Sequence, residues 1–299
     1  MHRSFSQLRP EAGFTLFELV LVVAISSIIA GMLNSFIRRP MEAYRDMERR
    51  ATLVDVAETA LRRMARDVRA SLPNSLRVSG DKRSLEILHL ADGARYREDP
   101  GTNPTTSEDH TNPNDWLSFS GDTQFNILGR LSHLDPNYGQ ALTAGTRLAI
   151  YNTSTNVYTD AATSANPGVI TPAATTITVT DDVDEDKLTL SSSFEFLLRS
   201  PRQKVYVIES PVSYICDPTG ETITRYGSYN INAIQPTDPG VAPLSTAASA
   251  LVTNRVAACE FLYDPGTPSR AGLLTIALTL SEAGEQIRLF QQVHVNNTP

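Results

Sequence analysis

The segment Glu11-Ala12-Gly13-Phe14-Thr15-Leu16-Phe17-Glu18, followed by an apolar run that ends at Ile37, decides the fold of this chain. No charged residue occurs from Leu19 to Ile37, and with Phe14 to Phe17 the apolar segment reaches about 24 residues, enough to span a bilayer. The carboxylate of Glu18 is the exception, because a charge near the bilayer centre costs roughly 2.5 kcal/mol or more. The segment therefore predicts a membrane-spanning helix that carries one acid for a specific purpose.

A processing signal precedes the apolar run rather than following it. Arg3 and Arg9 lie in a short polar leader that ends in the small residues Ala12 and Gly13. An ordinary secretory signal has its cleavage site beyond the apolar region, so that cleavage removes this region. Cleavage after Gly13 would instead keep the apolar helix in the mature chain and remove residues 1–13 as a leader.

This arrangement resembles the class III signal of type IV pilins and of the pseudopilins of type II secretion. The resemblance implies that a prepilin peptidase cleaves between Gly13 and Phe14 and methylates the new amino terminus at Phe14. It makes Glu18 the fifth residue of the mature chain, the position at which the family keeps a glutamate. The family mechanism also implies that the Glu18 carboxylate meets the Phe14 amino group in the filament core, where pairing lowers the cost of burying either charge.

Helical periodicity continues beyond the apolar run, but with an amphipathic pattern. Apolar residues recur at steps of three and four with Arg, Asp and Glu between them, which predicts an amphipathic helix over residues 38–73 that packs on a domain. The apolar stripe consists of Tyr44, Met47, Ala51, Val54, Ala57, Leu61, Met64, Val68 and Leu72. As one helix with the membrane segment (residues 14–37), the element would be roughly 90 Å long. Pro40 is expected to kink it near the membrane exit, and Pro73 to end it.

After residue 75 the periodicity becomes alternating, which predicts an antiparallel, β-rich domain over residues 74–299. Candidate strands are Leu85–Leu90, Arg147–Tyr151, Thr176–Thr180, Leu188–Leu190, Phe194–Leu198, Lys204–Ile208, Val212–Ile215, Ile223–Tyr226, Ala258–Tyr263, Leu273–Leu280 and Gln286–Val295. Glu282 to Glu285 is expected to form a hairpin turn, and Asp99–Asn114 and Gln235–Ala248 to be loops or insertions. The expected fold class is α+β and type IV pilin-like: a long N-terminal helix packed on an antiparallel β-rich domain.

Charge and motifs narrow the classes of function. The chain has 26 basic and 33 acidic residues and a formal charge of -7, which argues against general polyanion binding, so no nucleic-acid partner is expected. It contains no phosphate-binding glycine loop, no H-E-x-x-H and no G-x-S-x-G, and we expect a non-enzyme without a cofactor or a resident metal. The acidic run Asp181–Asp186 offers oxygens for Ca²⁺ but lacks the spacing of a calcium loop, and a solvated acidic turn is the favoured interpretation.

The two cysteines, Cys216 and Cys259, have an oxidation state that depends on the compartment. In the cytoplasm they would be buried thiols, whereas export to a periplasm favours a disulfide between them. Closing a loop of about 43 residues is worth roughly 4 kcal/mol in the chain-entropy model.

Two further stretches narrow the resemblance to minor pilins. Arg66-Asp67-Val68-Arg69 and the segment Leu72–Val78 are similar to the helix end of large minor pilins related to pseudopilin J and pilin W. Tyr214–Asp217, Arg225-Tyr226 and the tail from Cys259 to Pro299 are most similar to a minor pilin of the mannose-sensitive hemagglutinin (MSHA) pilus. The resemblance implies a protein that primes pilus assembly or forms part of the filament tip. The implied partners are the major pilin, other minor pilins and an inner-membrane assembly platform driven by a cytoplasmic ATPase.

The resemblance also implies a location: a single pass through the inner-membrane lipid with the C-terminal domain in the periplasm, and later the pilus. The distribution of charge opposes this topology. Arg38, Arg39, Arg45, Arg49 and Arg50 follow the apolar run, and the positive-inside rule alone would keep the domain in the cytoplasm. We prefer the more specific leader signal. Two other functions stay open: a J-type minor pseudopilin of a type II secretion system, and a membrane-tethered ligand-binding protein for adhesion or DNA uptake.

Overall fold

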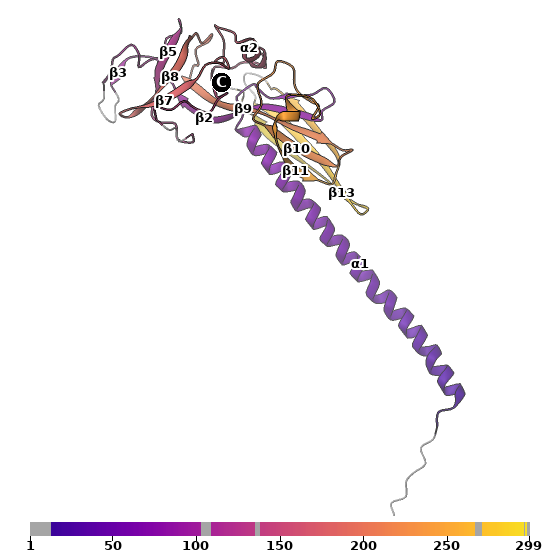
Figure 1. Cartoon of the computed structure of the whole chain (residues 1–299). Helices are drawn as coiled ribbons and strands as arrows, with labels where there is room; N and C mark the ends of the chain where they lie inside the picture. The colour runs from indigo at the N-terminus through magenta and orange to yellow at the C-terminus, as the bar shows by residue number, and fades with distance from the viewer. Residues whose placement is uncertain (1–12, 103–108, 135–137, 267–270, 296, 298–299) are drawn as a thin grey trace, which may run out of the picture. The chain divides into compact units, whose positions relative to one another are not determined.

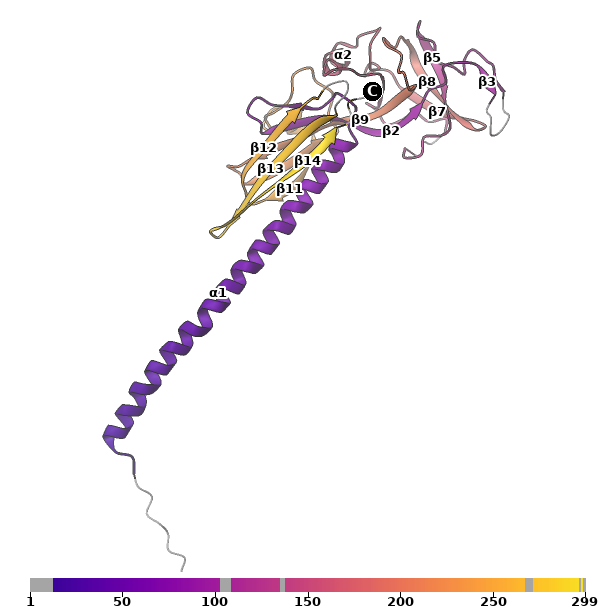
Figure 2. The same ribbon diagram turned by 180° about the vertical axis from the view of Figure 1, so that it is seen from behind.

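The computed structural model describes residues 13–102, 109–134, 138–266, 271–295 and 297. Most of the leader, the centre of the Asp99–Asn114 segment and parts of the C-terminal tail lie outside the described residues. The chain divides into two compact units, the first ending at Thr52 and the second, which we call the head, beginning at Leu53. Figure 1 colours the chain from the N- to the C-terminus, and Figure 2 shows the same ribbon from behind.

Helix α1 (Leu16–Arg69, 54 residues) begins in the first unit and ends in the head. Pro40 lies inside this helix and does not interrupt it, and the expected kink of the helix axis stays a prediction. The helix ends three residues before the expected Leu72, because the backbone N–H of Leu72 already donates to the carbonyl of Leu88 (2.8 Å) in the neighbouring sheet.

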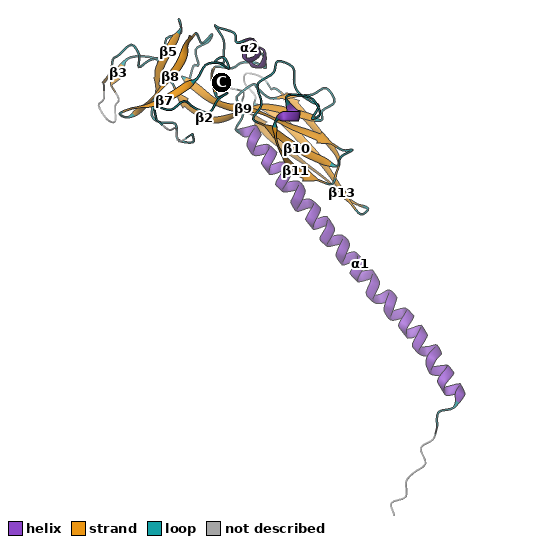
Figure 3. Ribbon diagram, in the orientation of Figure 1, coloured by secondary structure: helices purple, strands orange, loops and turns teal. Residues whose placement is uncertain are grey.

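In the described residues, the head contains four antiparallel sheets, whose strands Figure 3 draws in orange. The six-stranded sheet has the order β1 (Arg77–Val78), β2 (Ser84–Arg95), β9 (Lys204–Asp217), β10 (Thr222–Gly227) and β11 (Ala248–Asn254), and β6 (Arg147–Ile150) also pairs with β9. The three-stranded sheets are β12 (Val256–Asp264), β13 (Gly272–Glu282) and β14 (Glu285–Val295), and β5 (Asp122–Ile127), β8 (Glu185–Phe194) and β7 (Ile177–Asp182). A small pair, β3 (Gly101–Thr102) and β4 (Asp109–His110), completes the set, with the short helices α2 (Val157–Thr163) and η1 (Leu244–Thr246).

Strand β9 is long enough to contribute residues to two separate hydrophobic cores of the head. It joins two segments that were expected as separate strands, Lys204–Ile208 and Val212–Ile215. Strand β2 pairs along one edge of β9 from Lys204 to Ile215. The opposite edge is shared, because β6 pairs with residues 205–208 and β10 with residues 213–217. Residues 209–212 of β9 therefore lie between the two shorter strands.

The main core forms where the last turns of α1 meet the six-stranded sheet and the β12–β14 sheet. The apolar helix face from Leu53 to Val68 is buried there against residues such as Tyr214 and Phe261. Each fully buried side chain of this size contributes about 1.5–3 kcal/mol. The predicted apolar stripe is confirmed only from Ala57 onward, since Tyr44, Met47 and Val54 are 70%, 73% and 37% exposed.

A second core fills the space between the β5–β8–β7 sheet, β6 and the first half of β9. Its aromatic centre includes Phe125, Phe194 and Phe196, and the rings of Phe194 and Phe196 meet edge to face at 4.9 Å. The expected strand Phe194–Leu198 was wrong, because β8 ends at Phe194 and the chain turns away. The sequence patterns also missed β5, β11 and α2. The hairpin turn was correct: Glu282 pairs with Glu285 around Ala283 and Gly284.

Candidate functional site

The N-terminus of α1 is capped by the side chain of Thr15. Thr15 is the residue before the helix, and the backbone N–H of Glu18 donates to its Oγ1 atom (3.3 Å). Thr15 and Glu18 have the spacing S/T-x-x-E, and Phe14 and Leu19 occupy the positions of a hydrophobic staple. Glu18 thus lies in the first helical turn, where the helix dipole favours a negative charge. Sequence reasoning missed this cap, although the spacing is visible in the chain.

The surface that follows the cap is apolar and uncovered. Leu16–Leu33 has a mean hydropathy of 2.5, and none of it is buried inside the chain, so the helix is long and apolar enough to cross a membrane. Phe14 and Phe17 are each 76% exposed. Glu18 is exposed on the same segment, and no basic side chain of the described residues forms an ion pair with it. This segment has the chemistry of a surface that lipid or other protein chains cover.

Gly13 lies in open space at the start of the described chain. A Cβ atom added to Gly13 would meet nothing within 4 Å, and its backbone is not in the left-handed region that favours glycine. The fold therefore does not require glycine at this position.

Helix α1 is fixed to the six-stranded sheet by a polar contact inside the head. The Asp67 carboxylate oxygen Oδ2 accepts hydrogen bonds from the Tyr214 hydroxyl and from Arg225 Nε, each at 2.7 Å. Burial, together with the Asp67 carboxylate, raises the pKa of the Tyr214 hydroxyl well above its ordinary value. These residues come from three stretches on which the resemblance to minor pilins rests, and the structure brings them together.

The two cysteines form a disulfide. Cys216 lies near the end of β9 and Cys259 lies in β12, with 6.5 Å between their Cα atoms and a sequence separation of 43. The disulfide joins the six-stranded sheet to the β12–β14 sheet, the two sheets that enclose the end of α1.

The acidic segment Asp181–Asp186 is a hairpin turn between β7 and β8, but the expectation of a solvated turn was wrong for its second half. The side chains of Glu185 and Asp186 are 0% exposed. Glu185 accepts hydrogen bonds from Nε and Nη2 of Arg97, and Asp186 accepts them from the backbone N–H of Leu131 and the hydroxyl of Tyr138. The carboxylates form a buried polar network.

The same network contains a set of potential metal ligands. One donor atom each from His110, Asp115 and Asp182 lies within 4.8 Å of the others. However, Lys187 Nζ lies 3.0 Å from Asp115 and 2.9 Å from Asp182, so an ammonium already neutralises these oxygens. Although burial lowers the pKa of Lys187, its hydrogen bonds to Asp182 and Asp115 outweigh burial and raise it. Sequence reasoning missed the network because its members are far apart in the chain.

A comparison with known families gives one match. Residues 8–34 match the model of the prokaryotic N-terminal methylation motif, a type IV prepilin-like signal that includes Gly13, Phe14 and Glu18. Comparisons of the whole chain with curated proteins and with solved structures give no match.

The matched signal lies at the start of the exposed apolar helix, which is followed by the β-rich head. The chain carries a type IV prepilin-like N-terminal signal, and its α+β fold, an N-terminal helix followed by an antiparallel β-rich domain, is consistent with a pilin-like fold. Its apolar N-terminal helix fits the membrane anchor that is typical of prepilin-like proteins.

Proposed function

We propose that this protein is a minor pilin that takes part in the biogenesis of an MSHA-like type IV pilus, where it primes assembly or forms part of the filament tip. The observation that carries the proposal is the methylation motif at residues 8–34, combined with an uncovered apolar helix that presents Glu18 in its first turn. The MSHA assignment rests on the resemblance, read from the sequence alone, of the Cys259–Pro299 tail to the minor pilin called MshO.

In this proposal, prepilin peptidase cleaves after Gly13 and methylates Phe14. Cleavage would place a new positive charge next to the N-terminal end of a helix, which the helix dipole disfavours. The Glu18 carboxylate in the same turn would offset that charge, in its own chain or in a neighbour. The protein would wait in the inner membrane with its head in the periplasm until the assembly platform and its ATPase move it into the filament beside the major pilin and other minor pilins.

Mass spectrometry of the mature N-terminus is the primary test. The expected terminus is methylated Phe14, and an intact Met1 in assembled protein would overturn the proposal. A bulky residue in the variant Gly13→Leu should block cleavage while the head stays folded, because the space around Gly13 is open.

Glu18→Gln tests the assembly step and has a matched control in the same helix. Glu18→Gln should abolish piliation or incorporation of this subunit, whereas Glu42→Gln, an exposed position beyond the first turn, should leave both intact. Normal incorporation of the Glu18→Gln protein would count against the role of the carboxylate.

The nearest alternative is a J-type minor pseudopilin of a type II secretion system. The matched motif fits both systems. Deletion of the gene separates them, because loss of surface pili with normal protein secretion supports the pilus, and loss of secretion with normal pili supports the pseudopilus.

A further inference from the structure

The shared edge of strand β9 leaves a gap in the six-stranded sheet. The pairing of β6 with β9 ends at Ile208 and the pairing of β10 with β9 begins at Ser213, so no strand of the described residues pairs with residues 209–212 on this edge. Pro211 lies in the gap, and a proline has no backbone N–H with which to continue a ladder. The topology therefore opens the sheet at one defined place.

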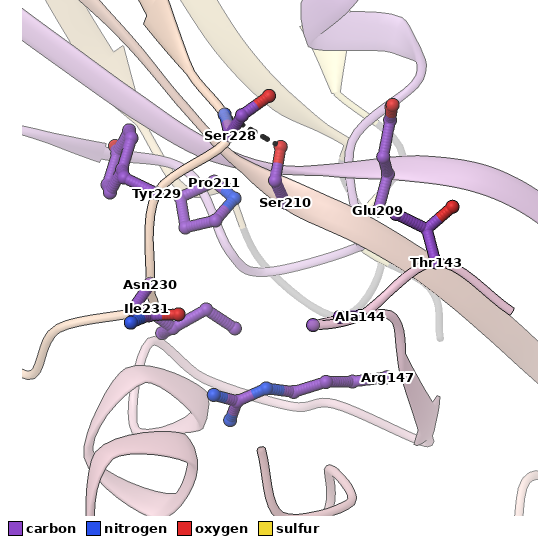
Figure 4. A pocket seen from close by; sticks show the side chains of 11 residues that line it. Thr143, Ala144, Arg147, Glu209, Ser210, Pro211, Ser228, Tyr229, Asn230 and Ile231 are labelled. Atoms are coloured by element: carbon purple, nitrogen blue, oxygen red, sulfur yellow. Dashed lines mark hydrogen bonds between the residues drawn. The ribbon is translucent and has the colours of Figure 1, made fainter. Parts of the chain in front are cut away.

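A pocket occupies this gap, and Figure 4 shows the side chains that line it. The start of β6 contributes Arg147, the gap in β9 contributes Glu209 and Ser210, and the chain after β10 contributes Ser228 and Asn230. The cavity has a volume of about 160 Å³, which is smaller than the sites of drug-sized ligands and suits only a small ligand or one group of a larger ligand.

Arg147 is the unusual member of this lining. Only 4% of the residue is exposed, and its Nη1 atom donates to the carbonyl of Ala161 (3.0 Å), in the last turn of α2. Its guanidinium carries five N–H donors, yet in the described part of the chain no carboxylate forms an ion pair with it. Burial lowers the pKa of Arg147, and no neighbouring acid opposes this effect. Buried charges in proteins are normally paired with an opposite charge, and an anion in the pocket would supply the counter-charge that this guanidinium lacks within the described residues.

The other polar groups of the pocket do not supply that anion. The carboxylate of Glu209 is 61% exposed and lies 3.2 Å from His89 Nδ1. The hydroxyl of Tyr229 is occupied by Ser213 and Glu86 at 2.6 and 2.9 Å. Ser210 accepts a hydrogen bond from the backbone N–H of Ser228 (3.3 Å) and keeps its own proton to donate. The lining therefore offers one buried cation and several hydroxyl and amide groups.

We propose that this pocket binds a small hydroxylated ligand through an oxyanion, a carboxylate or a phosphate group, that pairs with Arg147. The planar guanidinium fork matches either group with two parallel hydrogen bonds. The serine hydroxyls and the Asn230 amide contact the remainder of the ligand. This binding activity is separate from pilus assembly and does not depend on it.

The test uses the full mature chain, ¹⁵N-labelled, in a sugar-free polyoxyethylene detergent. The probes are D-glucuronate for a carboxylate and D-glucose 6-phosphate for a phosphate, with D-glucose as the neutral control. The readout is the Nε–Hε signal of the Arg147 guanidinium, assigned by its loss in the variant Arg147→Lys. At least one oxyanion should shift this signal saturably, and the more effective probe identifies the group.

Two variants remove the site in different ways. Arg147→Gln should weaken binding about tenfold or more, as expected for loss of a charge-assisted pair, when binding is followed by calorimetry. Ala144→Trp, on an exposed loop beside the pocket, should block binding without touching the buried core. The exposed Arg202→Gln is the matched control and should bind as the wild type does. The proposal is overturned if neither oxyanion shifts the Arg147 signal, if D-glucose binds equally well, or if Ala144→Trp binds as tightly as the wild type.

Discussion

Asp67 of helix α1 and Arg225 of strand β10 form an ion pair at 2.7 Å, in which the two side chains are only 15% and 26% exposed. The same carboxylate oxygen accepts the Tyr214 hydroxyl, so one acid near the helix end holds two neighbouring strands. This contact sets the position of the helix end on the sheet, because each donor comes from a different strand of the six-stranded sheet.

Asp67→Ala should lower the free energy of unfolding by about 1–3 kcal/mol, because two partly buried donors lose their acceptor. The measurement is urea unfolding of the full chain in detergent, followed by the fluorescence of Trp116, the single tryptophan of the chain. Asp55→Ala on an exposed face of the same helix is the control and should stay within about 0.5 kcal/mol of the wild type. Equal stability of the Asp67 variant would show that this contact is not a stabilising one.

Loss of the disulfide should have the largest effect on stability among these changes. Cys216→Ser with Cys259→Ser removes a closed loop of 43 residues, which corresponds to roughly 4 kcal/mol in the chain-entropy model. The same urea titration should show this loss, and reduction of the wild-type protein should reproduce it. A wild-type protein that is unaffected by reductant at every urea concentration would contradict the expectation.

Glu86 should make stability depend on pH in the acidic range. Its carboxylate is 0% exposed between Arg77 (2.6 Å) and the Tyr229 hydroxyl (2.9 Å), and burial, only partly opposed by Arg77, raises its pKa above the ordinary value. The folded state then keeps this proton to higher pH than the unfolded state does. The contribution of Glu86 is therefore complete below the unfolded pKa of about 4.3 and is lost as pH rises through the higher folded pKa.

The variant Glu86→Gln measures that contribution. The difference in unfolding free energy between the wild type and Glu86→Gln should shrink as pH rises from about 4.3 toward neutrality. Urea titrations at several pH values give this difference, and Glu58→Gln, an exposed acid of α1, controls for general charge effects. A difference that grows with pH would mean that the pKa of Glu86 is lowered instead.

Lys187→Met tests whether the ammonium group of Lys187 neutralises the buried Asp115 and the partly exposed Asp182. Without it, Asp115 and Asp182 would face each other with one cation fewer, and the unfolding free energy should fall by about 1–3 kcal/mol. Lys204→Met, which removes a lysine from β9 that forms no ion pair with described residues, should cost less. Thermal unfolding of both variants in one buffer makes the comparison direct.

Variants at Thr15 and Glu18 distinguish a role in capping the helix from the proposed role in assembly. The bond to Thr15 Oγ1 comes from the backbone of Glu18, so Glu18→Gln leaves it in place. Thr15→Val should cost about 0.5–2 kcal/mol of local helix stability and fray the first turn. Amide hydrogen exchange of the mature chain in detergent should therefore be faster for residues 16–19 in Thr15→Val and unchanged in Glu18→Gln. Equal fraying in both variants would mean that Glu18 acts through the cap.

Periodicity predicted the elements whose side chains are sorted cleanly between core and solvent. Helix α1 and strands such as β13 and β14 have that property, and their bounds lie within a few residues of the expected ones. Strand β5 was missed because its sequence is polar, and the buried Asn126 in it serves the polar network rather than an apolar core. Strand β11 was missed because it is mostly exposed.

Of the residues singled out for function, some could be found from the sequence and others could not. Gly13, Phe14 and Glu18 are contiguous in sequence, so their pattern can be found without a structure. Arg147 is an ordinary arginine in an apolar strand by sequence, and its significance depends on burial and on an absent partner, which are properties of the folded chain. The burial of Arg147 and the absence of a carboxylate partner among the described residues both follow from contacts between distant parts of the chain, not from local propensity.

The pairing of Arg95 with Lys204 at the tips of β2 and β9 has a consequence for how the head can vary. The backbone N–H of Tyr96 also bonds to the carbonyl of Gln203 (2.7 Å), so the chain departs and returns at one point. The segment between these residues also contacts the rest of the head, because β6 pairs with β9 and because Asn152 and Tyr158 donate hydrogen bonds to the carbonyls of Pro73 and Ser75. A change within this segment would therefore alter one wall of the Arg147 pocket and would also reach the chain that follows α1.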